Sequence, residues 1–233
     1  KRSTFCLIKL AKNAPQNEAT SERYPMHDTV SALADGLRQT SAMELVAVIL
    51  ALVYLILAVR ENLWCWAAAG GSTLIYLFLF FEVGLYAESA LQIYYLGMAG
   101  YGFQQWRSKA SAHPLPEAKA IIRWSIPKHL LALTFIAAST SSLGWVLLQT
   151  DSQAPFLDAF TTCAALVTTY MVTQKILENW IYWLVIDAAA IVLYLDRALY
   201  FTALLFGIYI VIVIVGYWRW LKIFRISQKG SQT

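Results

Sequence analysis

The sequence predicts an all-α membrane protein with seven transmembrane helices, and three observations support this fold class. Apolar residues make up 59% of the 233 positions and charged residues only 14%, whereas a soluble domain needs more charge on its wetted surface. The apolar runs are continuous rather than alternating, which indicates helices and excludes a β-barrel. Two groups of motifs also occur twice along the chain, which predicts an internal repeat.

Seven stretches are long enough to cross a hydrocarbon core of about 30 Å, a distance that takes about 20 helical residues. They are residues 41–59, 63–81, 87–106, 126–148, 156–174, 178–195 and 199–220. Several joints between them are very short, as in Arg60-Glu61-Asn62, so the helices on either side must run antiparallel. The chain also has nine Trp and thirteen Tyr, which is typical of a protein with two membrane–water interfaces.

The chain divides into five parts. Residues 1–40 are polar and mixed, with no apolar run of signal-peptide length. Within them, apolar residues at helical spacing between 28 and 38 predict a short amphipathic helix at the outer surface. Beyond this tail we expect a three-helix repeat (41–106), a basic loop with a linker helix (107–148), a second three-helix repeat (149–220) and a basic cytoplasmic tail (221–233).

The distribution of Lys and Arg predicts the orientation, because these residues favour cytoplasmic loops. The opposite loops contain Arg197 and are otherwise acidic. We therefore expect the C-terminus in the cytoplasm and the N-terminus outside, although the basic residues of the N-terminal tail would favour the cytoplasm. The basic residues that fall on the predicted cytoplasmic side are Arg60, Arg107, Lys109, Lys119, Arg123, Lys128, Lys175, Arg219, Lys222, Arg225 and Lys229.

The repeated motifs lie about 116 residues apart. Glu61-Asn62 with a following Trp is echoed by Glu178-Asn179-Trp180, and Gly100-Tyr101-Gly102 with Trp106 is echoed by Gly216-Tyr217 with Trp220. The first three spans then correspond to the last three, and the fourth is unpaired. One extra crossing gives both units the same orientation, which is a 3+1+3 parallel repeat as in the SWEET sugar transporters. Such repeats enclose a substrate site at their interface.

Polar side chains inside the spans predict where that site lies, because a polar group in hydrocarbon must face protein or a cavity. In the sixth span Asn179, Trp183 and Asp187 follow one another at intervals of four residues, on one helical face. Similar stripes occur in the second and third spans. The candidate substrate-binding residues are Gln92, Asn179, Trp183, Asp187, Asn62, Trp66, Thr73 and Tyr95.

Amides, hydroxyls and aromatic planes of this kind suit an uncharged or delocalised ring that bears hydroxyls, such as a nucleoside or vitamin. An aromatic face also binds a pyridinium, with a gain of up to about 2 kcal/mol when desolvated. Each residue has a structural alternative: Trp anchors helices at interfaces, and Asn62 and Asn179 are suited to capping helices. Gln92 and Asp187 lie mid-span, where a structural hydrogen bond is the alternative to a substrate contact.

Other functional classes have little support. An intramembrane enzyme would need a nucleophile with a base, or a metal cluster, and no His lies mid-span. The three cysteines are scattered and predict neither a disulfide framework nor a metal site. A retinal protein needs a lysine in its last span, and residues 199–218 contain none. The net charge of +4 is explained by the cytoplasmic loops, so we expect no nucleic-acid partner.

The second half of the chain resembles the PnuC family of nicotinamide riboside transporters. The likeness rests on Glu178-Asn179-Trp180-Ile181-Tyr182-Trp183 after Lys175 and on Leu199-Tyr200, with weaker matches at Glu61-Asn62, Leu85-Tyr86, Leu91-Gln92 and Gly100-Tyr101-Gly102. It covers roughly residues 40–222. The resemblance implies a 3+1+3 arrangement, a central nicotinamide riboside site lined by Asn, Gln and Trp, and a homo-oligomer, for which a trimer is one option.

The resemblance further implies a bacterial inner-membrane protein that takes up a vitamin B3 precursor for NAD biosynthesis by facilitated diffusion, with no cofactor of its own. A cytoplasmic kinase would trap the product. Related branches carry thiamine or riboflavin, which stay open as alternatives, as does proton coupling through Asp187. The family also accepts Asn at that position, so a role for the negative charge of Asp187 is a separate question.

Overall fold

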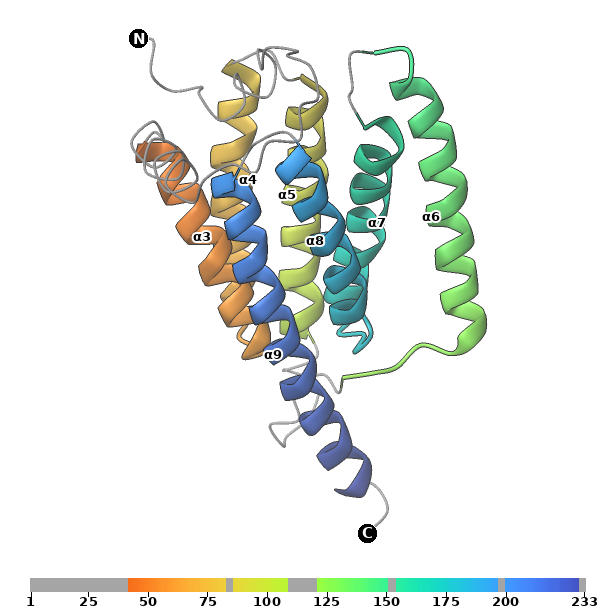
Figure 1. The fold of residues 1–233 in the computed structure, drawn as a ribbon. Coiled ribbons are helices and arrows are strands. Elements are labelled where there is room, and N and C mark those ends of the chain that lie inside the picture. The colour runs from red at the N-terminus through yellow and green to blue at the C-terminus, as the bar shows by residue number, and fades with distance from the viewer. Residues whose placement is uncertain (1–41, 83–85, 109–120, 151–153, 197–199, 231–233) are drawn as a thin grey trace, which may run out of the picture.

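The computed structural model describes residues 42–82, 86–108, 121–150, 154–196 and 200–230, and the predicted amphipathic helix at 28–38 lies outside these ranges. The described part contains seven helices (Figure 1), which confirms the predicted fold class. They are α3 (Ala42–Val59), α4 (Cys65–Glu82), α5 (Tyr86–Ser108), α6 (Ile126–Leu147), α7 (Pro155–Thr173), α8 (Asn179–Asp196) and α9 (Tyr200–Gly230).

The helix boundaries lie within a few residues of the predicted spans, with one exception. α9 continues as a helix to Gly230, through most of the segment expected as a basic tail, and it projects beyond the other helices (Figure 1). Among the described residues, six helices are long and apolar enough to cross a membrane. The seventh, α5, is more polar than these six because it carries side chains such as Gln92 and Gln104.

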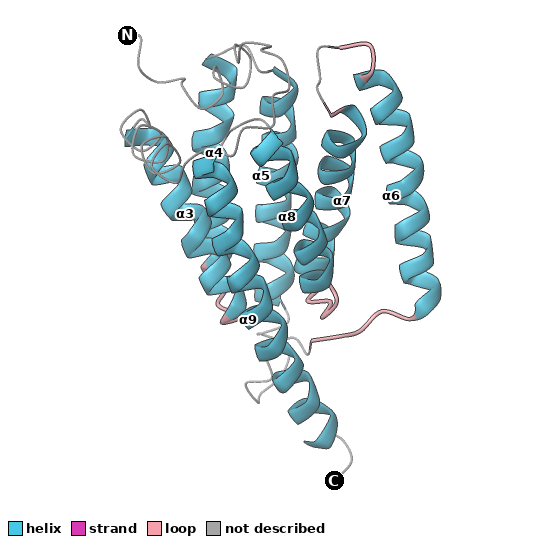
Figure 2. Cartoon of the chain, in the orientation of Figure 1, coloured by secondary structure: helices cyan, strands magenta, loops and turns pink. Residues whose placement is uncertain are grey.

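α6 is the unpaired fourth helix, and it stands at the edge of the bundle (Figure 1). In the described part of the chain it packs mainly against α7, and near its start the His129 ring stacks on Tyr182 of α8, with Nδ1 3.0 Å from the phenol oxygen. Large apolar side chains such as Leu131 and Trp145 are exposed on it, as expected for a helix that faces lipid. Figure 2 shows the contrast between the long connection that precedes α6 and the tight turns between α3 and α4 and between α7 and α8.

The remaining helices form two units, α3–α4–α5 and α7–α8–α9, and each unit packs through its middle helix. The units contact each other through α3 with α9 and through α5 with α7. These two contacts are equivalent, since α3 corresponds to α7 and α5 to α9. Within the described residues no backbone contact joins α4 and α8, so the two middle helices stand on opposite sides of the centre of the molecule.

The turns after α3 and α7 define how the two units align. Glu61 and Lys175 both have φ of 55°, and each stands two residues beyond its helix. The next residues, Asn62 and Ile176, donate their amides to the carbonyls of Leu57 and Met171 at 2.9 and 3.0 Å. Both turns are therefore Schellman caps, and equivalent residues of the two units lie 114 positions apart.

This spacing corrects the alignment that the sequence suggested. In the second pair of motifs Gly102 and Trp106 match Gly216 and Trp220 at the same interval of 114 residues, whereas the two Gly-Tyr pairs, 116 residues apart, are out of register by two. The two Glu-Asn pairs are out of register by three residues, since the structural equivalent of Glu61 is Lys175 rather than Glu178. The error arose because identical letters were matched, whereas the turn geometry depends on which residue adopts positive φ.

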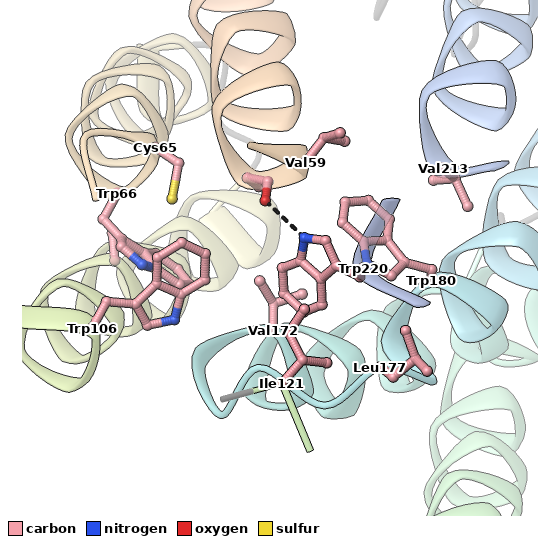
Figure 3. Close-up of a cluster of buried hydrophobic side chains, with 12 residues drawn as sticks. Val59, Cys65, Trp66, Trp106, Ile121, Val172, Leu177, Trp180, Val213 and Trp220 are labelled. Atoms are coloured by element: carbon pink, nitrogen blue, oxygen red, sulfur yellow. Dashed lines mark hydrogen bonds between the residues drawn. The ribbon is translucent and has the colours of Figure 1, made fainter. Parts of the chain in front are cut away.

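Four tryptophans form the core at the end of the bundle that contains these turns (Figure 3). Trp66 meets Trp106 edge-to-face with ring centroids 5.4 Å apart, and Trp180 meets Trp220 in the same way at 5.3 Å. The indole N–H of Trp106 donates to the Thr173 carbonyl and that of Trp220 to the Ala58 carbonyl, both at 3.2 Å. Each of these bonds crosses from one unit to the other.

Candidate functional site

An ion pair closes the end of the bundle between the two units. Nζ of Lys175 lies 2.7 Å from Oε2 of Glu61, and the two side chains are only 3% and 11% exposed. The same ammonium stands 4.6 Å from the ring centroid of Trp106. Lys175 is thus held by a carboxylate and by an aromatic face from the other unit, which is an arrangement that offsets the cost of burying its charge.

Glu178 has a different partner and a different role. Its carboxylate accepts a hydrogen bond from Nε of Arg123 at 2.7 Å and one from the Trp124 amide at 3.3 Å. The segment before α6 also pairs with the α7–α8 turn, because the Leu177 amide donates to the Ile122 carbonyl at 2.8 Å. The hydrogen bond to Glu178 raises the pKa of the Arg123 guanidinium. Glu178 therefore binds the segment before α6 to the start of α8 and does not contact the centre between the two units.

The two asparagines stand at the same end of the bundle. Oδ1 of Asn62 accepts a hydrogen bond from the Trp64 amide at 2.9 Å, and the side chain is exposed, which matches the capping interpretation. Asn179 is fully buried, and its Nδ2 donates to the Ile176 carbonyl at 2.6 Å. Its Oδ1 has no hydrogen-bond partner among the residues that the structure describes, so Asn179 retains one acceptor for a ligand or a water.

Trp66 and its equivalent Trp180 are packed into the core. They are 3% and 2% exposed, and neither indole N–H has a hydrogen-bond partner in the described ranges. Both lie flat against a glycine: a Cβ at Gly102 would stand 2.4 Å from the Trp66 ring, and one at Gly216 would stand 2.7 Å from the Trp180 ring. Trp66 therefore shapes the closed end of the centre.

The middle of the bundle holds the remaining predicted residues of α4 and α8. Thr73 and Asp187 are equivalent positions of the two units at the interval of 114 residues, and they are 9% and 3% exposed. Within the described part of the chain, Asp187 has neither a hydrogen bond nor an ion pair. Trp183, one turn before Asp187, is half-buried and packs against both core clusters.

α5 supplies Gln92 and Tyr95, both half-buried. The neighbouring Tyr94 donates its hydroxyl to the Leu166 carbonyl at 2.9 Å, which fixes α5 against α7. Tyr95 stands edge-to-face with Tyr94 at 5.6 Å. Tyr209 of α9 is the equivalent of Tyr95, so a phenol from each unit lies at the same depth in the bundle.

The sequence placed Tyr209 in the last span, facing the middle, but the candidate substrate-binding residues did not include it. Tyr209 interacts electrostatically with Asp187, with Tyr76 of α4 and with Tyr194 of α8. Alignment at the interval of 114 residues would have singled out Tyr209, because Tyr95 and Tyr209 are identical at that spacing. Among the described residues no group of three His, Cys, Asp or Glu could hold a metal ion.

This architecture is that of a membrane transporter built as a parallel repeat. It has two equivalent three-helix membrane units, a linker helix and a polar centre between the units. A family model described as "Nicotinamide mononucleotide transporter" matches residues 41–222. The chain therefore belongs to the nicotinamide mononucleotide transporter family, whose members are transporters rather than enzymes. It is a multi-pass protein of the bacterial inner membrane.

Curated relatives share about a quarter of their residues with this chain. The nicotinamide riboside transporter PnuC of Escherichia coli is 26% identical over 184 residues, which cover 66% of this chain and 73% of that protein. The riboflavin/roseoflavin transporter RibM of Streptomyces davaonensis is 25% identical over 180 residues, with 76% and 83% covered. A crystal structure of the vitamin B3 transporter PnuC has the same fold, with a TM-score of 0.63, 18% identity, and 87% and 94% covered.

Proposed function

We propose that this protein carries nicotinamide riboside into the cytoplasm by facilitated diffusion, through alternating access of its two three-helix units. The observation that carries the proposal is the polar centre between α4 and α8, which no backbone contact joins within the described residues, in a chain of this transporter family. The E. coli relative is a nicotinamide riboside transporter. Rocking of two equivalent units about such a centre is the usual form of alternating access.

The charges of the spans favour the riboside over the mononucleotide. A phosphate needs Arg, Lys or a helix N-terminus to replace its hydration. The six helices of the two units contain no Lys or Arg within their membrane-spanning parts. These parts are residues 42–59, 65–82, 86–106, 155–173, 179–196 and 200–218. Lys175 at the end of the centre is already paired with Glu61. A phosphorylated substrate would therefore meet Asp187 and find no counter-charge, which is strongly unfavourable in a buried site.

In this proposal the predicted residues have distinct roles. Gln92, Thr73 and the free Oδ1 of Asn179 hydrogen-bond the carboxamide and ribose hydroxyls. Trp183 and Tyr95 contact the faces of the rings. Asn62 and Trp66 hold the closed end in shape, as a cap and as a packed core residue.

The closed end is the cytoplasmic gate in this proposal. The Glu61–Lys175 ion pair and the two indole–carbonyl bonds from Trp106 and Trp220 all join the two units there. The excess of Lys and Arg in the flanking loops supports a cytoplasmic location for this end. Release of substrate inward would require these links to break.

Uptake of radiolabelled nicotinamide riboside into liposomes that contain the purified protein tests the proposal. We expect faster equilibration than in empty liposomes, with no accumulation above the outside concentration and no change when a proton gradient is collapsed. Equal rates in empty and protein-containing liposomes would overturn the assignment. Faster uptake of thiamine or riboflavin would assign another vitamin, and accumulation abolished by an ionophore would show proton coupling.

A further inference from the structure

Asp187 is a buried acid that lacks a partner. It is 3% exposed, and no hydrogen bond or ion pair reaches it from the described residues. A carboxylate buried in this way costs several kcal/mol unless it meets a positive group or takes up a proton. By contrast, the equivalent position in the other unit is Thr73, a neutral residue. Only one side of the centre therefore carries this cost.

Tyr209 of α9 is close enough to Asp187 to interact with it, and it belongs to a group of aromatic side chains from three helices. Tyr209 interacts electrostatically with Asp187 and with two further phenols, Tyr76 and Tyr194. Phe206 joins them, with ring centroids 5.2 Å from Tyr194 and 5.3 Å from Tyr209. We call Tyr76, Tyr194, Phe206 and Tyr209 the aromatic cluster. The faces of aromatic rings carry negative electrostatic potential and attract cations, so the cluster and Asp187 favour the same sign of charge.

The described residues offer no cation that could neutralise this site. The spans α4, α8 and α9 carry no Lys or Arg up to residue 218. Lys175 lies at the start of the turn before α8, three turns of helix away from Asp187, and its ammonium is held by Glu61 at 2.7 Å. Without a described cation beside it, Asp187 is neutralised either by a proton or by a positively charged ligand, and a cationic ligand gains the attraction that the carboxylate offers.

We infer that Asp187 and the aromatic cluster select substrates whose ring carries a delocalised positive charge and discriminate against neutral rings of the same shape. The inference rests on the proposed function, and it names the class of substrate: a pyridinium or a similar weakly hydrated organic cation. Such a cation loses less hydration free energy on burial than an ammonium does. The attraction of the carboxylate therefore exceeds the cost of desolvating the ligand. A neutral ring gains nothing from Asp187.

The matched pair of ligands for the test is nicotinamide riboside and its 1,4-dihydro form, which has the same carboxamide and ribose but a neutral ring. Affinities are measured by calorimetry on the purified protein and uptake by liposome assays. The variants are Asp187→Asn, which removes the charge at constant size, and Asp187→Glu, which keeps it. Asp196→Asn is the control, because Asp196 is an exposed acid at the end of the same helix.

The wild type should bind the cation about tenfold to a hundredfold more tightly than the dihydro form, as expected for one charge pair in a site of intermediate dielectric. Asp187→Asn should lose most of this preference, whereas Asp187→Glu and Asp196→Asn should retain it. If the wild type transports both ligands equally, or if Asp187→Asn keeps the preference, the inference fails and the proposed function stands. If the wild type transports neither ligand, the proposed function fails and the inference with it. A thermal unfolding measurement on each variant separates lost selectivity from lost folding.

Discussion

Lys175 and Glu61 occupy equivalent positions of the two three-helix units and form an ion pair with each other, with Nζ 2.7 Å from Oε2. Both residues close a Schellman cap with φ of 55°. When equivalent residues of two repeated units contact each other, they cannot both carry the same charge, because like charges would repel. The two copies here differ in sign and form a bond between the two units.

Removing one partner of this pair should destabilise the protein. Lys175→Ala leaves Glu61 buried without a counter-charge, for which we expect a loss of about 3–5 kcal/mol in the free energy of unfolding. Thermal or denaturant unfolding of the purified protein measures this. The exchange Glu61→Lys with Lys175→Glu should recover most of the loss. No recovery would mean that the pair acts through its surroundings rather than through its charges.

Gly102 and Gly216 should not tolerate alanine. A Cβ at either position would stand within 2.8 Å of a tryptophan ring, and overpacking of this kind costs about 1–3 kcal/mol. Gly100→Ala and Gly207→Ala are matched controls on the same two helices, because nothing lies within 4 Å of a Cβ there. These controls should be neutral or slightly stabilising, since alanine favours helices. Equal stability of all four variants would contradict the packing.

The two crossing hydrogen bonds can be separated from the packing of the tryptophans. Trp106→Phe and Trp220→Phe remove an indole N–H that bonds a carbonyl of the other unit, whereas Trp66→Phe and Trp180→Phe remove one that has no partner. All four changes reduce volume in the same core. We expect the first two to cost about 1–2 kcal/mol more than the second two in unfolding experiments. No difference would show that these bonds contribute nothing net.

Gln92→Ala and Trp183→Ala should each weaken binding of nicotinamide riboside about tenfold, which corresponds to about 1.4 kcal/mol. The loss of a hydrogen bond or of a ring contact is of this size. Isothermal calorimetry measures the dissociation constants. Trp145→Ala is the control, because Trp145 is 64% exposed on α6 and should leave binding unchanged. Unchanged binding in the Gln92 and Trp183 variants would make these residues structural.

The number, order and approximate ends of the helices could be read from the sequence, because the length of an apolar run is set by the thickness of the membrane. The unpaired position of α6 also followed from counting crossings. By contrast, the sequence did not indicate which residues the charged side chains at the turns would contact. Glu61 and Glu178 look alike in sequence, yet one is bonded to Lys175 and the other to Arg123.

What the sequence by itself determined is the membrane class, the seven helices and the existence of a duplication, since these depend on composition, run length and local spacing. The tertiary structure alone decided the register of the duplication, which is 114 residues rather than about 116, because register depends on which residues meet across the two units. It also decided that Asp187 stands without a partner and that Asn62 serves as a cap. Side chains far apart in sequence have no local signal of their contact, so only packing reveals it.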